Sequence, residues 1–236
     1  MPAAPSTRTL ILLAAERLFA ERGIAAVSLR EIAAAAGQGN TSAAAYHFGT
    51  KADLFTAIVE YRTEPINRHR LELVDAIDRG NAPDDLRTWV EALVVPMAAP
   101  LAAPHEPLER EPGQVGWYLE FLVEAMRYRR ISRGELGELR HVEGVVRTLD
   151  GLRRHLSPLP ARVVDNRLDL TLEFVPQALA HHERLLRESH VRPRPADTQL
   201  AIGDLIDAMV GLLSAPCSPA VRAAADETVS ARPTVS

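Results

Sequence analysis

Two short helical patterns joined by a glycine constrain the fold of this 236-residue chain more than any other feature. The first covers residues 29–36, where apolar residues recur at the three- and four-residue spacing of one helix face. Ser28 precedes this pattern and Glu31 follows three residues later, which is typical of a capping box at a helix start. Gly37 ends the pattern, because glycine adopts the positive φ of a helix stop without a steric penalty. The sequence therefore predicts a helix, a tight turn and a second helix near 41–47.

The second helix is suited to lie in the major groove of DNA. That groove is about 12 Å wide and admits one bare helix, whose N-terminal residues then face the base edges. Three consecutive alanines, 43–45, would let the backbone approach closely, and Lys51, the only lysine of the chain, opens the helix that follows. The alternative is that Tyr46 and His47 only pack, as in helix-turn-helix units inside enzymes. The predicted DNA contacts are Ser28, Gln38, Asn40, Thr41, Ser42, Ala44, Tyr46, His47 and Lys51.

Three segments in a fixed order carry a resemblance to a known family. They are 14–23 (Ala-Ala-Glu-Arg-Leu-Phe-Ala-Glu-Arg-Gly), 29–37 (Leu-Arg-Glu-Ile-Ala-Ala-Ala-Ala-Gly) and 46–51 (Tyr-His-Phe-Gly-Thr-Lys). With them, residues 8–62 resemble the DNA-binding domain of the TetR family of bacterial transcriptional regulators. The resemblance implies an all-α protein with an N-terminal three-helix DNA-binding domain and a larger C-terminal helical bundle for dimerisation and ligand binding. It further implies a repressor that binds a near-palindromic double-stranded DNA operator as a homodimer and responds to a small-molecule effector.

The remainder of the chain also has a helical pattern, without alternating strand runs or a repeat of fixed period. Helices are predicted near 65–79, 84–101, 114–130, 137–156, 160–189 and 197–213, separated by segments rich in proline and glycine. We predict a disordered tail at 1–7, a DNA-binding domain at 8–62, an effector-binding and dimerisation domain at 63–213, and a flexible tail at 214–236.

The last two predicted helices each carry an apolar stripe that could face a second copy of the chain. The resemblance implies a four-helix bundle between subunits, although the same stripe would equally serve the core of one chain. The predicted interface residues are Leu168, Leu172, Val175, Leu179, Leu205 and Met209.

The resemblance also implies an effector pocket in the second domain. Aromatic side chains and methionines are the candidates for its walls, because they combine apolar surface with adaptable or polar ends. Ordinary core packing is the commoner use of such residues. The predicted ligand-binding residues are Trp89, Met97, Trp117, Tyr118, Phe121 and Phe174, and Met126 was a further candidate.

Several classes of protein are disfavoured by what the sequence lacks. No catalytic motif is recognisable, His181 and His182 lack partners at metal-ligand spacing, and neither a metal nor a cofactor is expected. The most apolar run, 92–103, is interrupted by prolines and too short to span a membrane. A single cysteine, Cys217, is typical of a reducing compartment, so a cytoplasmic protein is expected.

Charge bears on the mode of DNA binding. The chain has a net charge of −4, whereas residues 1–62 carry six basic and five acidic side chains, a balance of +1. This balance favours a small module with few phosphate contacts over a protein that coats nucleic acid. The alternative function is a helical ligand-sensing or dimerisation protein without DNA binding, which would show no salt-dependent binding to a duplex.

Overall fold

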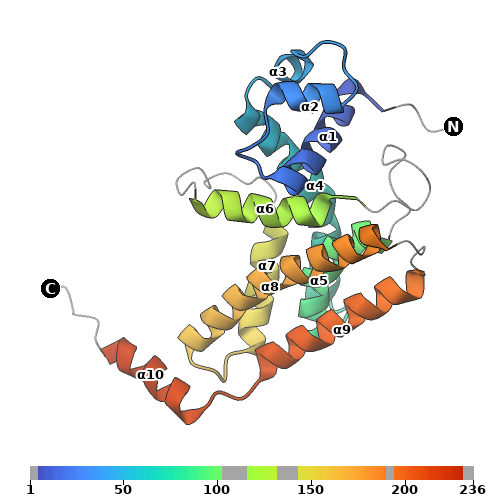
Figure 1. Cartoon of the computed structure of the whole chain (residues 1–236). Coiled ribbons are helices and arrows are strands. Elements are labelled where there is room, and N and C mark those ends of the chain that lie inside the picture. Colours follow the sequence, from blue (N-terminus) through green and yellow to red (C-terminus); the bar gives the residue numbers. More distant parts are fainter. Residues whose placement is uncertain (1–4, 103–115, 132–142, 190–193, 231–236) are drawn as a thin grey trace.

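Helices are the only regular elements among the residues that the structure describes. The computed structural model describes residues 5–102, 116–131, 143–189 and 194–230 (Figure 1). The all-α fold predicted from the sequence is confirmed for these residues. The helices are α1 (Thr7–Arg22), α2 (Leu29–Ala35), α3 (Ala43–Phe48), α4 (Lys51–Asp78), α5 (Leu86–Ala102), α6 (Tyr118–Ile131), α7 (Glu143–His155), α8 (Ala161–Glu188), α9 (Pro195–Ser214) and α10 (Pro219–Ser230).

Local capping fixes where the N-terminal helices begin and end. The predicted capping box is present at α2: the Ser28 side chain accepts the N–H of Glu31, whose carboxylate accepts the N–H of Ser28. Thr50 and Asp53 form a second capping box at the start of α4. Gly37 has a φ of +70°, as a glycine helix stop requires. The sequence thus sets the turn between α2 and α3 with short-range interactions.

The core of the N-terminal helices extends beyond the boundary expected at residue 62. The α4 helix runs without a break through that position, and Pro65 lies inside it. Phe121 of α6 is buried in the same cluster as Phe19 and Phe55, with ring centroids 6.3 and 6.0 Å away. Figure 1 shows α6 lying across the end of α1, between the N-terminal helices and the rest of the molecule. A helix from the second half of the chain therefore completes the N-terminal core.

The second core is built by the C-terminal half of α4 with α5, α7, α8 and α9. Trp89 of α5 is fully buried in it and donates its indole N–H to Asp84 at 2.6 Å. Burial lowers the pKa of the Arg70 guanidinium to about 10. This guanidinium donates to the backbone carbonyls of Ala92 and Leu93. Pro96 has no N–H to give the Ala92 carbonyl four residues earlier, so Arg70 satisfies a group that the proline leaves open.

Two differences from the sequence-based helix assignment stand out. Residues 65–79 are the second half of α4 and not a separate helix, because Pro65 lies at an exposed position that tolerates the loss of one backbone bond. The expected flexible tail at 214–236 contains α10, which starts at Pro219 after the N-cap residue Ser218. The start of the helix expected at 137–156 lies partly outside the described residues.

Within the described residues, no single helix has both the length and the apolar composition to cross a membrane. The α9 helix and residues 219–226 of α10 meet those criteria only as a pair, and the chain bends by 63° between them.

The contact between Gly151 and Trp89 gives a stability prediction. A Cβ atom at Gly151 would lie 2.3 Å from two ring carbons of Trp89, so an alanine cannot fit unless α5 and α7 separate. We expect Gly151→Ala to lower the free energy of unfolding by about 1–3 kcal/mol. Denaturant unfolding followed by circular dichroism measures this change.

Gly211→Ala is the matched control, because a Cβ atom there meets nothing within 4 Å. Alanine should stabilise this helical position by about 0.5–1 kcal/mol. Equal effects of the two substitutions would contradict the packing of α7 on Trp89.

Candidate nucleic-acid interface

The α3 helix has one face in the core and one face in solvent. Ala43, Ala44 and Phe48 are buried against the neighbouring helices. Tyr46 projects outward with 85% of its surface exposed, and the adjacent His47 is also exposed. The Tyr46 and His47 rings meet edge to face at 5.3 Å. An aromatic side chain exposed to this extent on a well-packed helix is available to a partner.

The turn before α3 adds polar groups to the same surface. Asn40, Thr41 and Ser42 are all exposed. The Asn40 side chain accepts the N–H of Ser42 at 2.9 Å, a local bond that sets the start of α3. Gln38 donates to the carbonyl of Ala36. Thr41 and Ser42 therefore remain the side chains of this turn best able to address a base edge.

Two of the predicted contact residues have other surroundings than expected. Ala44 is completely buried, so its methyl group belongs to the core and cannot touch DNA. Ser28 is exposed, but its hydroxyl donates to Glu31 at 2.7 Å within the α2 cap. The reason in both cases is local packing: α3 must place a small residue against the core, and α2 needs a cap.

The half-buried Lys51 side chain is bonded within its own domain. Its ammonium donates to the backbone carbonyls of Ile24, Ala25 and Val27 at 3.0–3.1 Å. A lysine ammonium has three donors, and all three are used by these carbonyls. The segment between α1 and α2 is thereby tied to the start of α4. A phosphate contact by this side chain would require at least one of these bonds to break.

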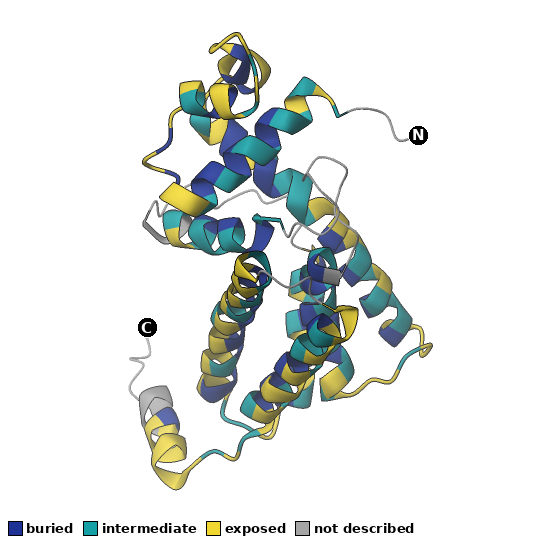
Figure 2. Ribbon diagram, turned by 45° about the vertical axis from the view of Figure 1, so that its right-hand side comes forward, coloured by how far each residue is buried: buried dark blue, intermediate teal, exposed yellow. Residues whose placement is uncertain are grey.

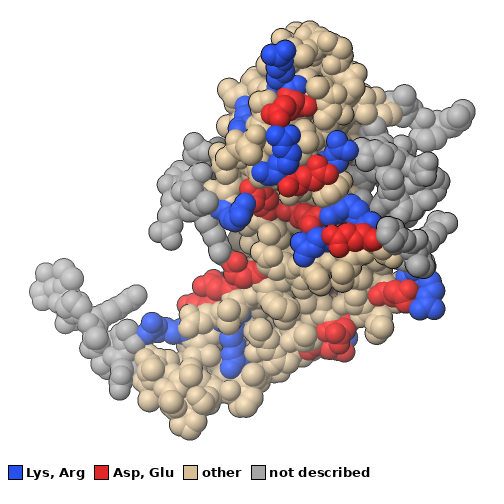
Figure 3. All heavy atoms as spheres, in the orientation of Figure 1, with Lys and Arg blue, Asp and Glu red and all other residues tan. Residues whose placement is uncertain are grey.

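The sequence analysis missed Arg8 as a cation near the candidate surface. Its guanidinium lies 4.8 Å from the ring centre of Phe48, at the end of α3, and the residue is exposed. Its position near α3 depends on how α1 crosses α3, which no local pattern shows. In the view of Figure 3, basic and acidic side chains alternate on the N-terminal helices without forming a single basic patch. One cause is Glu31, whose pKa is lowered to about 2 by bonds from Ser28 and which pairs with Arg22 at 2.8 Å.

The α6 helix links this N-terminal unit to the C-terminal core. Glu124 of α6 accepts the N–H of Ile24, at the end of α1, at 3.2 Å. At the start of α6, the buried carboxylate of Glu183 on α8 accepts the N–H groups of Leu119 and Glu120 at 3.1 and 2.9 Å. Arg187 of α8 pairs with Glu120, which adds a second tie to the same end of the helix. A movement of α8 against α6 would therefore be transmitted to α1.

Burial dominates the protonation of Glu183. Desolvation, with a smaller contribution from the charge of Glu16, raises the pKa of this carboxyl group to about 8. The bonds from Glu120 and Leu119 and the charge of Arg187 act in the opposite direction. The sequence analysis did not identify Glu183; the one signal that could have done so is a carboxylate four residues after Leu179, in line with the α8 apolar stripe.

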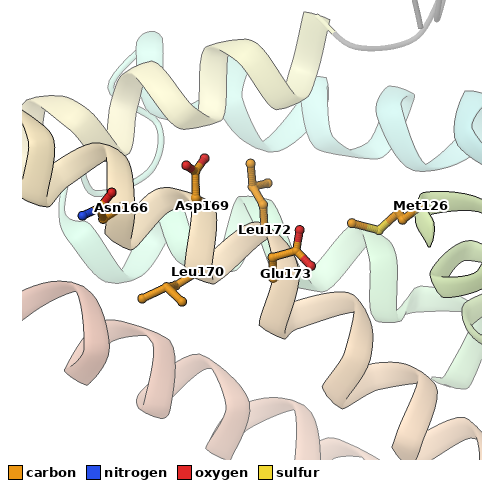
Figure 4. A pocket seen from close by; sticks show the side chains of 6 residues that line it. All are labelled: Met126, Asn166, Asp169, Leu170, Leu172 and Glu173. Carbon is orange, nitrogen blue, oxygen red and sulfur yellow. The ribbon is translucent and has the colours of Figure 1, made fainter. Parts of the chain in front are cut away.

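A hollow of about 770 Å³ lies beside α8. Its walls are one residue of α6 and one face of the N-terminal half of α8, as Figure 4 shows. The lining residues are Met126, Asn166, Asp169, Leu170, Leu172 and Glu173. Met126 was among the candidates from the sequence, whereas the other predicted ligand-binding residues lie elsewhere.

The structure does not bring those other residues together. Trp89 and Tyr118 are buried in the C-terminal core, and Phe121 is in the N-terminal core. Met97 packs at the edge of the C-terminal core, and Trp117 stacks under the Arg187 guanidinium at 3.5 Å. Phe174 is half exposed on α8. Apolar character alone did not distinguish a pocket wall from a core position.

Most of the predicted dimer-interface residues lie in the core of one chain. Leu168, Val175, Leu179, Leu205 and Met209 are each at most 8% exposed, and Leu172 is half-buried. Buried side chains have no free surface for a partner. The apolar surface that α8 does expose lies at other positions of the helix, at Leu170, Phe174 and Leu185.

The bonds of Lys51 predict a loss of stability on substitution. Lys51→Met should lower the free energy of unfolding by about 1–3 kcal/mol, because three carbonyls lose a charged donor. Arg30→Met removes an exposed cation from the same unit and is the control. Denaturant unfolding tests both variants; wild-type stability of Lys51→Met combined with weakened duplex binding would instead assign the ammonium to phosphate.

The raised pKa of Glu183 predicts a pH dependence of stability. Its folded-state pKa of about 8 exceeds the ordinary value of 4.5, so its contribution is fully present below pH 4.5 and is lost as pH rises through 8. Glu183→Gln should flatten the decline in unfolding free energy over this window. Glu188→Gln, an exposed change on the same helix, should keep the wild-type slope. If Glu183→Gln keeps the wild-type dependence of unfolding free energy on pH, the raised pKa of Glu183 is contradicted.

The exposed α3 surface lies in a segment of the chain that resembles a known protein family. Residues 11–58 match the family model described as bacterial regulatory proteins, tetR family. No match was found among curated proteins. A solved structure of a presumed TetR-family transcriptional regulator from Mesorhizobium loti MAFF303099 is 15% identical, with a TM-score of 0.47, over 87% of this chain and 96% of that chain.

A presumed transcriptional regulator from Rhodococcus sp. RHA1 is 21% identical, with a TM-score of 0.38, over 92% of this chain and 99% of that chain. The residues that match the family model run from α1 into α4, and this range includes the whole of α3 with its exposed face. The N-terminal helix-turn-helix of this chain is therefore similar, over residues 11–58, to that of the bacterial regulatory proteins of the tetR family.

Proposed function

We propose that this protein is a transcriptional repressor that binds a near-palindromic DNA operator as a homodimer and releases it in response to a small-molecule effector. The exposed face of α3 is the observation that carries the proposal. Tyr46 and His47 are exposed on a helix whose opposite face is buried, and Thr41 and Ser42 are exposed in the turn before it, so these side chains are free to enter a groove. Together with the family match over 11–58, this arrangement supports DNA as the partner.

The short recognition surface supports a dimer. The α3 helix has six residues, and the charge of residues 1–62 is close to neutral, so one copy would make few phosphate contacts. Two copies related by a two-fold axis would double these contacts on half-sites about one helical turn, or a multiple of it, apart. The proposed operator is near-palindromic for this reason.

The connections of α6 support a response to an effector. This helix shares a core with α1 through Phe121 and is capped by Glu183 of α8. An effector that binds one arrangement of α6 and α8 more tightly would shift the position of the N-terminal unit. It can shift the equilibrium only by its differential affinity for the two arrangements. We propose no enzymatic activity and a cytoplasmic location.

The alternative is a ligand-sensing or dimerisation protein that does not bind DNA. Such a protein has no need of an aromatic side chain 85% exposed on α3, since Tyr46 would serve no packing function there. Salt-dependent binding to a duplex separates the two functions, because phosphate contacts release counterions.

Two substitutions, one on α3 and one in the turn before it, test the proposed roles of these side chains. Tyr46→Phe removes only a hydroxyl, and if this group donates to phosphate, binding should weaken about three- to ten-fold on all duplexes alike. Thr41→Val should instead change which base pairs are preferred, because it removes a polar group aimed at base edges. Fluorescence anisotropy on a panel of labelled duplexes measures both effects. A sequence-specific loss in Tyr46→Phe, or an unaltered preference in Thr41→Val, would contradict the roles assigned here.

A further inference from the structure

Several cations of the N-terminal unit are engaged by groups of the same chain. The Lys51 ammonium donates to three backbone carbonyls. Arg22 and Arg62 are each paired with a carboxylate on another helix, at 2.8 and 2.6 Å. Arg8 is exposed and has no carboxylate partner in the described part of the chain, where its guanidinium contacts the ring of Phe48. The charge of Arg8 is therefore available to an anion from outside the chain.

The backbone of Arg8 is fixed by the start of α1. The Ser6 hydroxyl accepts the N–H of Thr9 at 3.1 Å, which caps the helix. Ile11 and Leu12, which follow in α1, are buried in the N-terminal core. The helix itself gives no reason for a cation here, because the positive end of a helix dipole lies in the first turn and the first turn of α1 has no acidic residue. The contact with α3 is the interaction that holds the guanidinium.

This guanidinium lies at the end of a row of rings on α3. Its Cζ atom is 4.8 Å from the centre of the Phe48 ring. The His47 ring is 6.4 Å from the Phe48 ring and 5.3 Å from the Tyr46 ring, and His47 and Tyr46 are both exposed. Figures 1 and 2 show the start of α1 at the same end of the molecule as α3, opposite the end that carries α10. Arg8 therefore adjoins the surface that we propose enters the groove.

A group beside a recognition helix meets the strands that border the groove. The major groove is about 12 Å wide, and a helix with its side chains is about 10–12 Å across, so the helix fills the groove. A cation beside the helix is therefore near phosphates, which carry no sequence information directly. A guanidinium suits this partner, because its planar fork of N–H donors matches two phosphate oxygens.

We propose that Arg8 binds the phosphate backbone beside the groove that α3 enters, and that the ring of Phe48 holds its guanidinium in position. The contact contributes to the affinity of the α3 surface and not to its choice of bases. The proposal rests on the proposed DNA-binding function. It assigns to Arg8, which lies before the residues 11–58 that match the family, the phosphate contact that the sequence analysis assigned to Lys51.

The salt dependence of duplex binding tests this contact. The probes are a duplex that the wild-type protein selects from a random pool and an unrelated duplex of equal length, followed by fluorescence anisotropy. Arg8→Gln should reduce the slope of log affinity against log salt by about 0.9 for each subunit that loses its phosphate. Between 1 M and 0.1 M salt, wild-type affinity should therefore rise about eight-fold more per subunit than that of the variant, on both duplexes.

Arg68→Gln is the matched control for the loss of charge. Arg68 is an exposed arginine in the C-terminal half of α4, where it pairs with Glu64 at 2.7 Å. The substitution removes the same charge outside the N-terminal unit, so the wild-type salt slope should remain. Arg8→Lys keeps the charge without the planar fork and should regain most of the slope. Equal slopes in Arg8→Gln and Arg68→Gln would contradict the phosphate contact.

Uncharged methylphosphonates locate the contact on the DNA. Each duplex carries one methylphosphonate in place of a phosphate, and the position is moved along the selected half-site. The wild-type protein should lose affinity at one position beside the bases read by α3, where Arg8→Gln should be insensitive. The variant should keep the wild-type response at the other positions. Identical profiles for the two proteins would overturn the proposal.

The outcomes separate a phosphate contact from a structural role of Arg8. If Arg8 only stabilises the end of α3, Arg8→Gln melts at a lower temperature by circular dichroism and keeps the wild-type salt slope, which refutes the proposal. A loss of affinity confined to one base sequence assigns Arg8 to a base edge and also refutes it. A wild-type protein without salt-dependent duplex binding refutes the proposed DNA-binding function itself, whereas the other outcomes leave that function intact.

Discussion

The burial of Phe121 is the interaction on which the arrangement of this protein depends. This side chain belongs to α6 yet completes the core formed by Phe19 of α1 and Phe55 of α4. Without it, the N-terminal helices would expose an aromatic surface to water, at a cost of about 1.5–3 kcal/mol for the one ring. The N-terminal unit is therefore packed against the rest of the chain and is not joined to it by a linker alone. The position of α6 sets its orientation.

Polar contacts complete the same junction. Glu16 is buried and pairs with Arg62 through two bonds of 2.6 and 2.8 Å, which join α1 to α4. Glu183 of α8 caps the start of α6, and Glu124 in the middle of α6 accepts the N–H of Ile24, so α6 is fixed by groups from two different parts of the chain. Buried ions are costly to leave unpaired, which makes such a junction adopt few alternative arrangements. This property suits a protein that would switch between two positions of its DNA-binding unit.

The sequence predicted those features that depend on neighbours in the chain. The capping box at Ser28 and the glycine stop at Gly37 are local, and the structure contains both. The three carbonyls held by Lys51 lie 24–27 residues away, so no periodic pattern shows that contact. Stripes on α8 and α9 identified buried residues, but periodicity does not distinguish the core of one chain from an interface.

The central claim is that the exposed face of α3 reads DNA in a two-fold arrangement. Selection of bound duplexes from a random pool by the purified full-length protein, read by sequencing at near-physiological salt, tests it most directly. The account predicts enrichment of one near-palindromic sequence with half-sites about one helical turn, or a multiple of it, apart. A folded, dimeric protein that enriches no sequence would contradict it.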